Sequence, residues 1–172
     1  SLRLGAIRRL YSNLGYEQRP WKDVLDYAKL GLKTFLADES LDGDLLQLVV
    51  FSHRVISSVP LTTDTKALTR VIDSVIPVAN TAFYDALMVS LQMANNSSGE
   101  TVLIALTDGN DNASRNSVND LVRLANERGV KIYIIGLGRV FPEPLIEITD
   151  KTDGFFYYTQ DPEQLTEIYR TI

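Results

Sequence analysis

Apolar residues recur along this chain with two periods, and the two periods alternate. In residues 21–36 apolar side chains return every three or four positions, as they do on one face of a helix. The segments 45–51 (LLQLVVF) and 101–106 (TVLIAL) are instead continuous apolar runs of strand length. The second run is too apolar for an edge strand, so we expect it inside a sheet.

The same two patterns predict the remaining elements. Helices are expected at 62–76, 81–93, 117–128 and 142–152, and strands at 55–61, 130–136 and 155–159. Gly129 suits the end of the third of these helices, and Asp161 is expected to cap a last helix.

From residue 101 onward strands and helices alternate with short connections. This order predicts an α/β fold with a doubly wound, mainly parallel central sheet and helices on both faces. We expect the strands that start at Leu45, Thr101, Val130 and Phe155 to lie in one sheet, the last three parallel. Ligands of such sheets bind at the carboxyl ends of the strands.

Two polar segments follow this rule. Residues 80–87 (NTAFYDAL) open a helix, and residues 106–112 (LTDGNDN) follow the apolar strand at 101–106. The hydroxyl of Thr81 and the carboxylate of Asp108 would be hard oxygen ligands, which suit Mg²⁺. Alternatively, Asp108 hydrogen-bonds only its own turn and Thr81 only caps a helix.

At these segments the chain resembles the von Willebrand factor A family, and its bacterial branch in particular. Further similar segments are Val49–Ser52, Ile134–Gly138 and Asp161–Leu165, so the resemblance runs from about residue 20 to the end. The resemblance implies a metal-ion-dependent adhesion site. In such a site an acidic side chain of a protein partner completes the coordination of Mg²⁺ or Mn²⁺. Thr81 would be the ligand from the second loop and Asp108 the carboxylate from the third.

The first loop of that site does not match. The family pattern is Asp-x-Ser-x-Ser after the first strand, and a gap-free count places Tyr11 where the aspartate belongs, with Asn13 and Gly15 in place of the serines. One carboxylate holds a divalent cation poorly, so we expect weak or absent Mg²⁺ binding. Asn80, Asp85 and Asp111 are the candidates for second-shell or alternative ligands.

Residues 4–10 (LGAIRRL) would then be a central strand, but Arg8 and Arg9 are costly to bury. Residues 2–14 have the apolar period of an amphipathic helix that ends near Gly15, and we favour that interpretation. The chain is therefore expected to be one domain over 1–172, with a divergent segment at 1–15 and a family-like core at 20–172. The first strand then precedes this numbering, or something else fills the centre of the sheet.

Composition removes several classes of function. The chain of 172 residues has no cysteine and one histidine, His53, which excludes disulfides, thiolate metal sites and sites that need two histidines. Its net charge of −5 argues against a non-specific nucleic-acid surface. Residues 1–33 carry seven Arg and Lys against three acids, which suits a solvated helix face or an acidic partner.

No apolar run is long enough to span a membrane, and no signal peptide is visible, although Ser1 in place of an initiator methionine suggests a processed or excised domain. We find no nucleophile–base pair, so the chain is not expected to be an enzyme and no catalytic residue is named. The favoured function is a protein-binding module of an extracytoplasmic or cell-surface protein. The alternatives are a degenerate structural domain in a larger assembly and, less favoured, a hydrolase.

Overall fold

The computed structural model describes residues 21–37, 46–51, 54–75, 81–94, 101–107, 110–138, 140–159, 161 and 164–172. The helix expected at 2–14, and the candidate site residues Asn80 and Asp108, lie outside these ranges. So does His53. The expectations for these residues therefore stay predictions.

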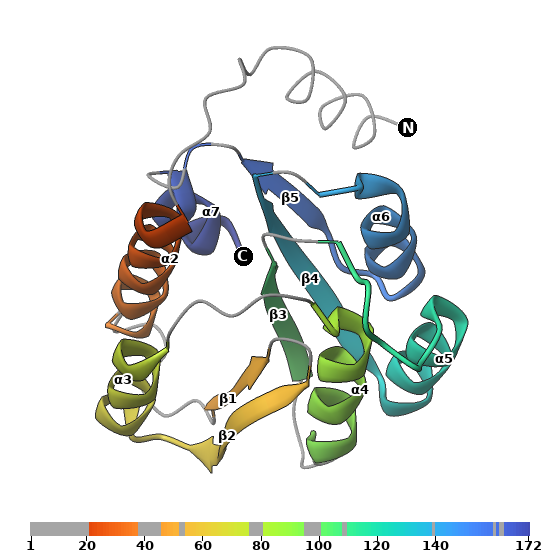
Figure 1. Ribbon diagram of the computed structural model, residues 1–172. Helices are drawn as coiled ribbons and strands as arrows, with labels where there is room; N and C mark the ends of the chain where they lie inside the picture. Colours follow the sequence, from red (N-terminus) through yellow and green to blue (C-terminus); the bar gives the residue numbers. More distant parts are fainter. Residues whose placement is uncertain are drawn as a thin grey trace.

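Eleven helices and strands follow one another in the described ranges (Figure 1). They are α2 (Trp21–Leu36), β1 (Leu46–Phe51), β2 (Val55–Thr62), α3 (Thr65–Ser74), α4 (Phe83–Met93), β3 (Thr101–Thr107), α5 (Val118–Arg128), β4 (Val130–Leu137), α6 (Pro142–Lys151), β5 (Phe156–Thr159) and α7 (Leu165–Thr171). Each corresponds to an expected element, with ends that differ by a few residues at most.

Local chemistry explains where these helices begin and end. The carboxylate of Asp64 accepts hydrogen bonds from two backbone amides in the first turn of α3, and Ser117 and Asp120 form a reciprocal capping box on α5. Gly129 ends α5 with a φ of 66°, a conformation that glycine adopts without strain. The expected cap at Asp161 stays a prediction, because residues 162 and 163, which separate Asp161 from the described start of α7, lie outside the described ranges.

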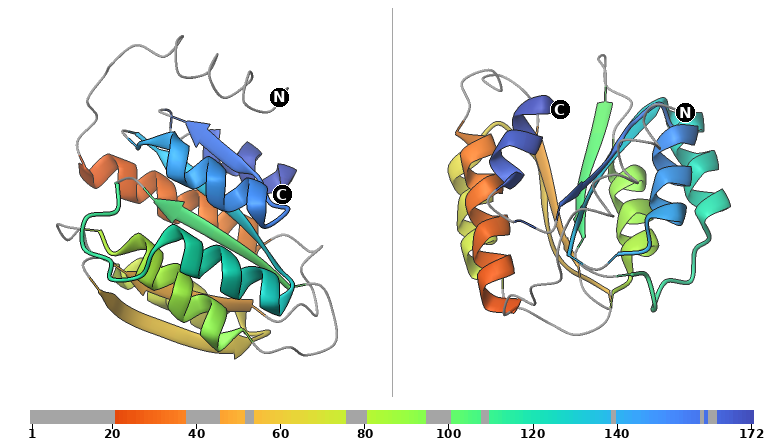
Figure 2. Two further views of the ribbon diagram at one scale, coloured as in Figure 1. Left: turned by 90° about the vertical axis from the view of Figure 1, so that its right-hand side faces the viewer. Right: turned by 90° about the horizontal axis from the view of Figure 1, so that it is seen from above.

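Strands β3, β4 and β5 form a parallel sheet in that order, which confirms the expected direction of these strands. Strand β4 is buried on both faces: Ile132 and Ile134 pack with α4, α5 and α6, whereas Ile135 and Leu137 pack with α2 and α7. Figure 2 shows these two groups of helices on opposite sides of the strands. The fold is thus α/β, with a mainly parallel sheet covered on both faces.

Strands β1 and β2 form a separate antiparallel pair. The expectation that β1 shares one sheet with β3, β4 and β5 is therefore wrong for the described residues. Among the described strands β3 is paired with β4, and its expected interior place stays a prediction because residues 1–20 lie outside the described ranges. The physical reason is that no strand among the described residues joins the ladder of β1 to that of β3.

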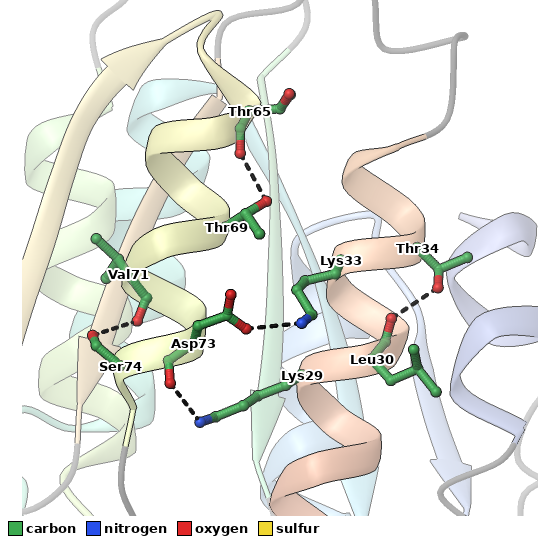
Figure 3. A network of polar contacts seen from close by, with 9 residues as sticks. All are labelled: Lys29, Leu30, Lys33, Thr34, Thr65, Thr69, Val71, Asp73 and Ser74. Atoms are coloured by element: carbon green, nitrogen blue, oxygen red, sulfur yellow. Dashed lines mark hydrogen bonds and ion pairs between the residues drawn. The ribbon is translucent and has the colours of Figure 1, made fainter.

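Helices α2 and α3 are tied together by two lysines of α2. The ammonium group of Lys33 lies 2.8 Å from the carboxylate of Asp73 on α3, and Lys29 donates to the backbone carbonyl of Asp73 at 3.1 Å (Figure 3). Two of the seven basic residues in 1–33 therefore bind acceptors on α3 of the same chain. None of the helices in the described ranges has the length and apolar character needed to cross a membrane.

Candidate functional site

The loop that follows β3 is joined to the start of α4 by reciprocal hydrogen bonds at Thr81. The amide of Thr81 donates to the side-chain oxygen of Asn112 at 2.9 Å, and the amide of Asn112 donates back to the carbonyl of Thr81 at 3.0 Å. Ala113 donates to the same carbonyl at 3.2 Å. Thr81 is thus held by its backbone, and α4 begins after Ala82 without a side-chain cap.

The carboxylate of Asp85 fixes the far end of this loop. It accepts hydrogen bonds from the amides of Arg115 and Asn116 at 2.9–3.0 Å, and from the side-chain amide of Asn116 at 2.8 Å. Desolvation on burial raises the pKa of Asp85, but the hydrogen bonds from Asn116 and Arg115 outweigh it, so the net pKa is lowered. Asp85 is therefore an ionised anchor for the loop backbone.

Asp111 closes a second link between the loop and α4. Its carboxylate accepts from the amide of Tyr84 at 3.2 Å and from the hydroxyl of Ser114, which itself accepts from the amide of Asp85 at 2.9 Å. Burial, followed by the charges of Asp111 and Glu147, raises the pKa of the Tyr84 phenol. The tyrosine therefore stays neutral beside two carboxylates.

A large apolar side chain stands exposed at the same end of the sheet. Phe141 follows β4 and is 68% exposed, and its amide donates to the side-chain oxygen of Asn110 in the loop after β3. The loops after β3 and β4 are thus joined, with an aromatic ring presented to solvent beside them. The tilted ring pair of Phe51 and Phe83, 5.8 Å apart, packs the start of α4 against β1.

Three of the five candidate residues lie in this one cluster: Thr81, Asp85 and Asp111. Asn80 and Asp108 lie outside the described ranges, so the convergence of Thr81 and Asp108 stays a prediction. Within the part of the chain that the structure describes, no group of three or more His, Asp or Glu side chains could hold a metal ion.

The sequence analysis assigns no role in this cluster to Asn112, Ser114, Asn116 or Phe141. The polar run at 110–117 (NDNASRNS) was the available signal, because Asn, Asp and Ser are the residues whose side chains bind nearby backbone in turns. Nothing in the sequence shows that the side chains of Asn112, Ser114 and Asn116 bind the start of α4, about 30 residues earlier.

Comparison with known proteins gives one matching family. The model of the von Willebrand factor type A domain matches residues 15–171. A protein of Borreliella burgdorferi described as uncharacterized is 26% identical over 168 residues, which cover 81% of this chain and 48% of that protein. The chain thus spans about half the length of this curated relative.

Solved structures show the same fold. The conserved hypothetical protein BatB from Bacteroides thetaiotaomicron has a TM-score of 0.70 at 17% identity, with 85% of each chain covered. A von Willebrand factor type A protein from Catenulispora acidiphila has a TM-score of 0.72 at 22% identity, covering 86% of this chain and 37% of that one. Mussel proximal thread matrix protein 1, solved with zinc in its metal-site motif, has a TM-score of 0.71 at 24% identity, covering 85% and 39%.

Proposed function

Since this chain belongs to the von Willebrand factor type A family, we propose that it is a non-enzymatic protein-binding module whose partner docks on the loops after β3 and β4. The observation that carries the proposal is the exposed ring of Phe141 beside a loop that hydrogen bonds hold rigid. Exposed aromatic side chains on preorganised loops are typical of the residues that dominate protein interfaces.

A divalent cation is the second part of the proposal. Thr81 and Asp108 are the candidate ligands for Mg²⁺ or Mn²⁺, and an acidic side chain of the partner would complete the coordination. The mussel protein with zinc in its metal-site motif supports this, because it has the same fold. Asp85 is a poor substitute ligand, since its carboxylate already accepts hydrogen bonds from Arg115 and Asn116.

Calorimetric titration with Mg²⁺ and Mn²⁺ tests the cation site. We expect dissociation constants in the millimolar range or weaker, equivalent to about 4 kcal/mol of binding free energy or less. Asp108→Ala should remove the remaining heat of binding, and Asp150→Ala, at an exposed carboxylate on α6, is the matched control. Micromolar affinity that Asp108→Ala abolishes would refute the weak site and indicate a further ligand.

Site-specific photo-crosslinking tests the docking surface. A photoreactive phenylalanine in place of Phe141 should capture a partner in cells, whereas the same group in place of Ile56 on β2 should not. Ile56 is a suitable control because it is also a large exposed apolar residue, 52% exposed against 68% for Phe141. Equal capture at the two positions would show that the loops after β3 and β4 are not the working surface.

A degenerate structural domain in a larger assembly is the second candidate. It is favoured by the relative from Borreliella burgdorferi, of which this chain matches only 48%. In that case neither Asp108→Ala nor Phe141→Ala would change partner binding. We also propose an extracytoplasmic or cell-surface location, which the fold shared with a pilus adhesin from Lactobacillus rhamnosus supports.

A further inference from the structure

A groove lies between α2 and α3, which pack against each other on the side of the strands opposite α4, α5 and α6 (Figure 2). The end of α2 contributes Lys33, Leu36 and Ala37 to its lining, and α3 contributes Lys66, Arg70 and two threonines one turn apart. Its volume is about 430 Å³, within the range of pockets that hold a ligand. Three of these lining residues are basic, and none of those that the structure describes is acidic.

Two of the three basic side chains have no carboxylate partner in the described part of the chain. Lys33 forms its ion pair with Asp73 at 2.8 Å. The guanidinium of Arg70 donates from Nε to the carbonyl of Lys66 at 3.3 Å, whereas neither Arg70 nor Lys66 pairs with a described Asp or Glu side chain. Both side chains are exposed at the groove. They are therefore available to an anionic ligand.

The acids nearest to these cations on α3 are held by other donors. The carboxylate of Asp64 caps the helix and accepts from two backbone amides of its first turn at 3.0 and 3.2 Å. The carboxylate of Asp73 binds Lys33, as Figure 3 shows. Positive charge is thus in excess at the groove, although the net charge of the chain is −5. Such a local excess attracts an anionic partner and disfavours a cationic one.

The spacing of Lys66 and Arg70 favours a peptide over a small anion. They lie four positions apart on α3, which is about 6 Å along the helix axis. Alternate side chains of an extended chain point the same way and are about 6.6 Å apart, so two carboxylates at alternate positions can meet both cations. The residue between them points to the opposite side, toward the wall that Leu36 and Ala37 form. A small anion would use the cations but leave this apolar wall without a partner.

We infer that this groove binds an extended acidic segment of a protein partner, with acidic side chains at alternate positions and an apolar residue between them. The carboxylates pair with Lys66 and Arg70, and the apolar residue packs on Leu36 and Ala37. Because both cations are exposed, salt weakens the interaction. The groove is separate from the loops after β3 and β4, and the inference does not rest on the function proposed for them.

Titration of the ¹⁵N-labelled chain of residues 1–172, followed by NMR, tests the inference. The probe is acetyl-Gly-Glu-Leu-Glu-Leu-Glu-Gly-amide, and a control peptide with Gln in place of each Glu keeps its shape without its charge. We expect the probe to shift the amide signals of residues 65–70, with a dissociation constant of about 1 mM or tighter, and the Gln peptide to have no effect. Raising NaCl from about 50 to about 500 mM should weaken the probe at least about fivefold.

Charge reversal locates the contact. Lys66→Glu and Arg70→Glu should each weaken the probe by at least about tenfold, because each turns an attractive contact into a repulsive one. Arg123→Glu on α5 is the matched control, since it makes the same change of charge at an exposed position on the other side of the strands, and it should leave the affinity unchanged. Phe141→Ala and Asp108→Ala should also leave it unchanged, so this test and the tests of the proposed function fail separately.

Four results would overturn the inference. The first is the absence of shifts at residues 65–70 at about 5 mM probe. The second is equal binding by the Gln peptide, or an equal loss of affinity in Arg123→Glu. The third is displacement of the probe by an equal concentration of inorganic phosphate, which would mean a site for a small anion. The fourth is binding of the probe only after the four acids of residues 38–44 are replaced by their amides, which would mean that the chain fills the groove itself.

Discussion

At the scale of the residue, Asp85 shows how one carboxylate organises a loop that lies 30 residues away in the sequence. A carboxylate in the first turn of α4 is favourable for the helix dipole, and the sequence alone indicates that much. The amides of Arg115 and Asn116, to which it is bound, could not be inferred from the sequence. The carboxylate of Asp85, a candidate for an alternative metal ligand, is thus occupied by backbone donors.

Asp85→Asn should lower the free energy of unfolding by about 1–3 kcal/mol at neutral pH, because the Arg115 and Asn116 donors lose a charged acceptor. Urea unfolding of the wild type and the variant measures this. Asp73→Asn is the matched control: it removes an exposed ion pair with Lys33 and should cost less than about 1 kcal/mol.

The pH dependence of the same variant has a defined sign. The pKa of Asp85 is lowered in the folded protein, so its contribution is complete above the unfolded pKa of about 3.9 and is lost as pH falls through the folded pKa. The difference in unfolding free energy between wild type and Asp85→Asn should therefore shrink below about pH 4. A constant difference from neutral to acid pH would show that charge is not the cause.

At the scale of the element, the sequence predicts which segments are helices and strands better than it predicts how they end. The apolar period of α2 gives its bounds directly, and Gly129 marks the end of α5. For α7 the described residues leave the start open: Gln164 donates to the carbonyl of Asp161, and the two residues between them lie outside the described ranges. Short capping residues are common in turns as well as at helix starts, so type alone does not decide.

The end of α4 depends on a residue from another helix. The guanidinium of Arg128, at the last position of α5, donates to the carbonyls of Leu91, Gln92 and Ala94 at 2.9–3.2 Å. These carbonyls lie in the last turn of α4, where helix carbonyls lack internal partners and carry partial negative charge. One cation thus closes α4 and fixes its packing against α5.

Arg128→Met should therefore destabilise the fold by about 2 kcal/mol, because three carbonyls lose a charged donor while the apolar stem is kept. Arg123→Met on the same helix is the control: the Arg123 side chain is 70% exposed and pairs with Asp120, so the loss should stay below about 1 kcal/mol. Thermal and denaturant unfolding of both variants measure the difference. Equal effects would mean that the cap on α4 contributes little.

At the scale of the whole molecule, the sequence predicts the class of the fold but not the division of its strands. The run at 45–51 is as apolar as the run at 130–136, so both are expected in one sheet. Among the described strands, β4 alone has a strand on each side, and β1 pairs with β2 apart from it. Which strands become neighbours depends on the long-range ladder, and residues 46–51 carry no local signal for it. The candidate site shows the same limit, since its elements were expected but its hydrogen bonds were not.

This division predicts two levels of local stability. The cores around β4 are made of buried side chains, and β4 has a strand on each side, whereas β1 and β2 form one pair whose described side chains are half-buried or exposed. Local opening requires less free energy where fewer apolar contacts and backbone hydrogen bonds are lost. Native-state hydrogen exchange in low denaturant should therefore show β1, β2 and α3 opening at least about 1 kcal/mol below β4, α5 and α6. β5, which pairs with β4 in the parallel ladder, should open with β4 and serves as the internal control. If β1 and β4 exchange with the same free energy and the same dependence on denaturant, the pair of β1 and β2 and the sheet of β3, β4 and β5 open as one cooperative unit, which would contradict the prediction.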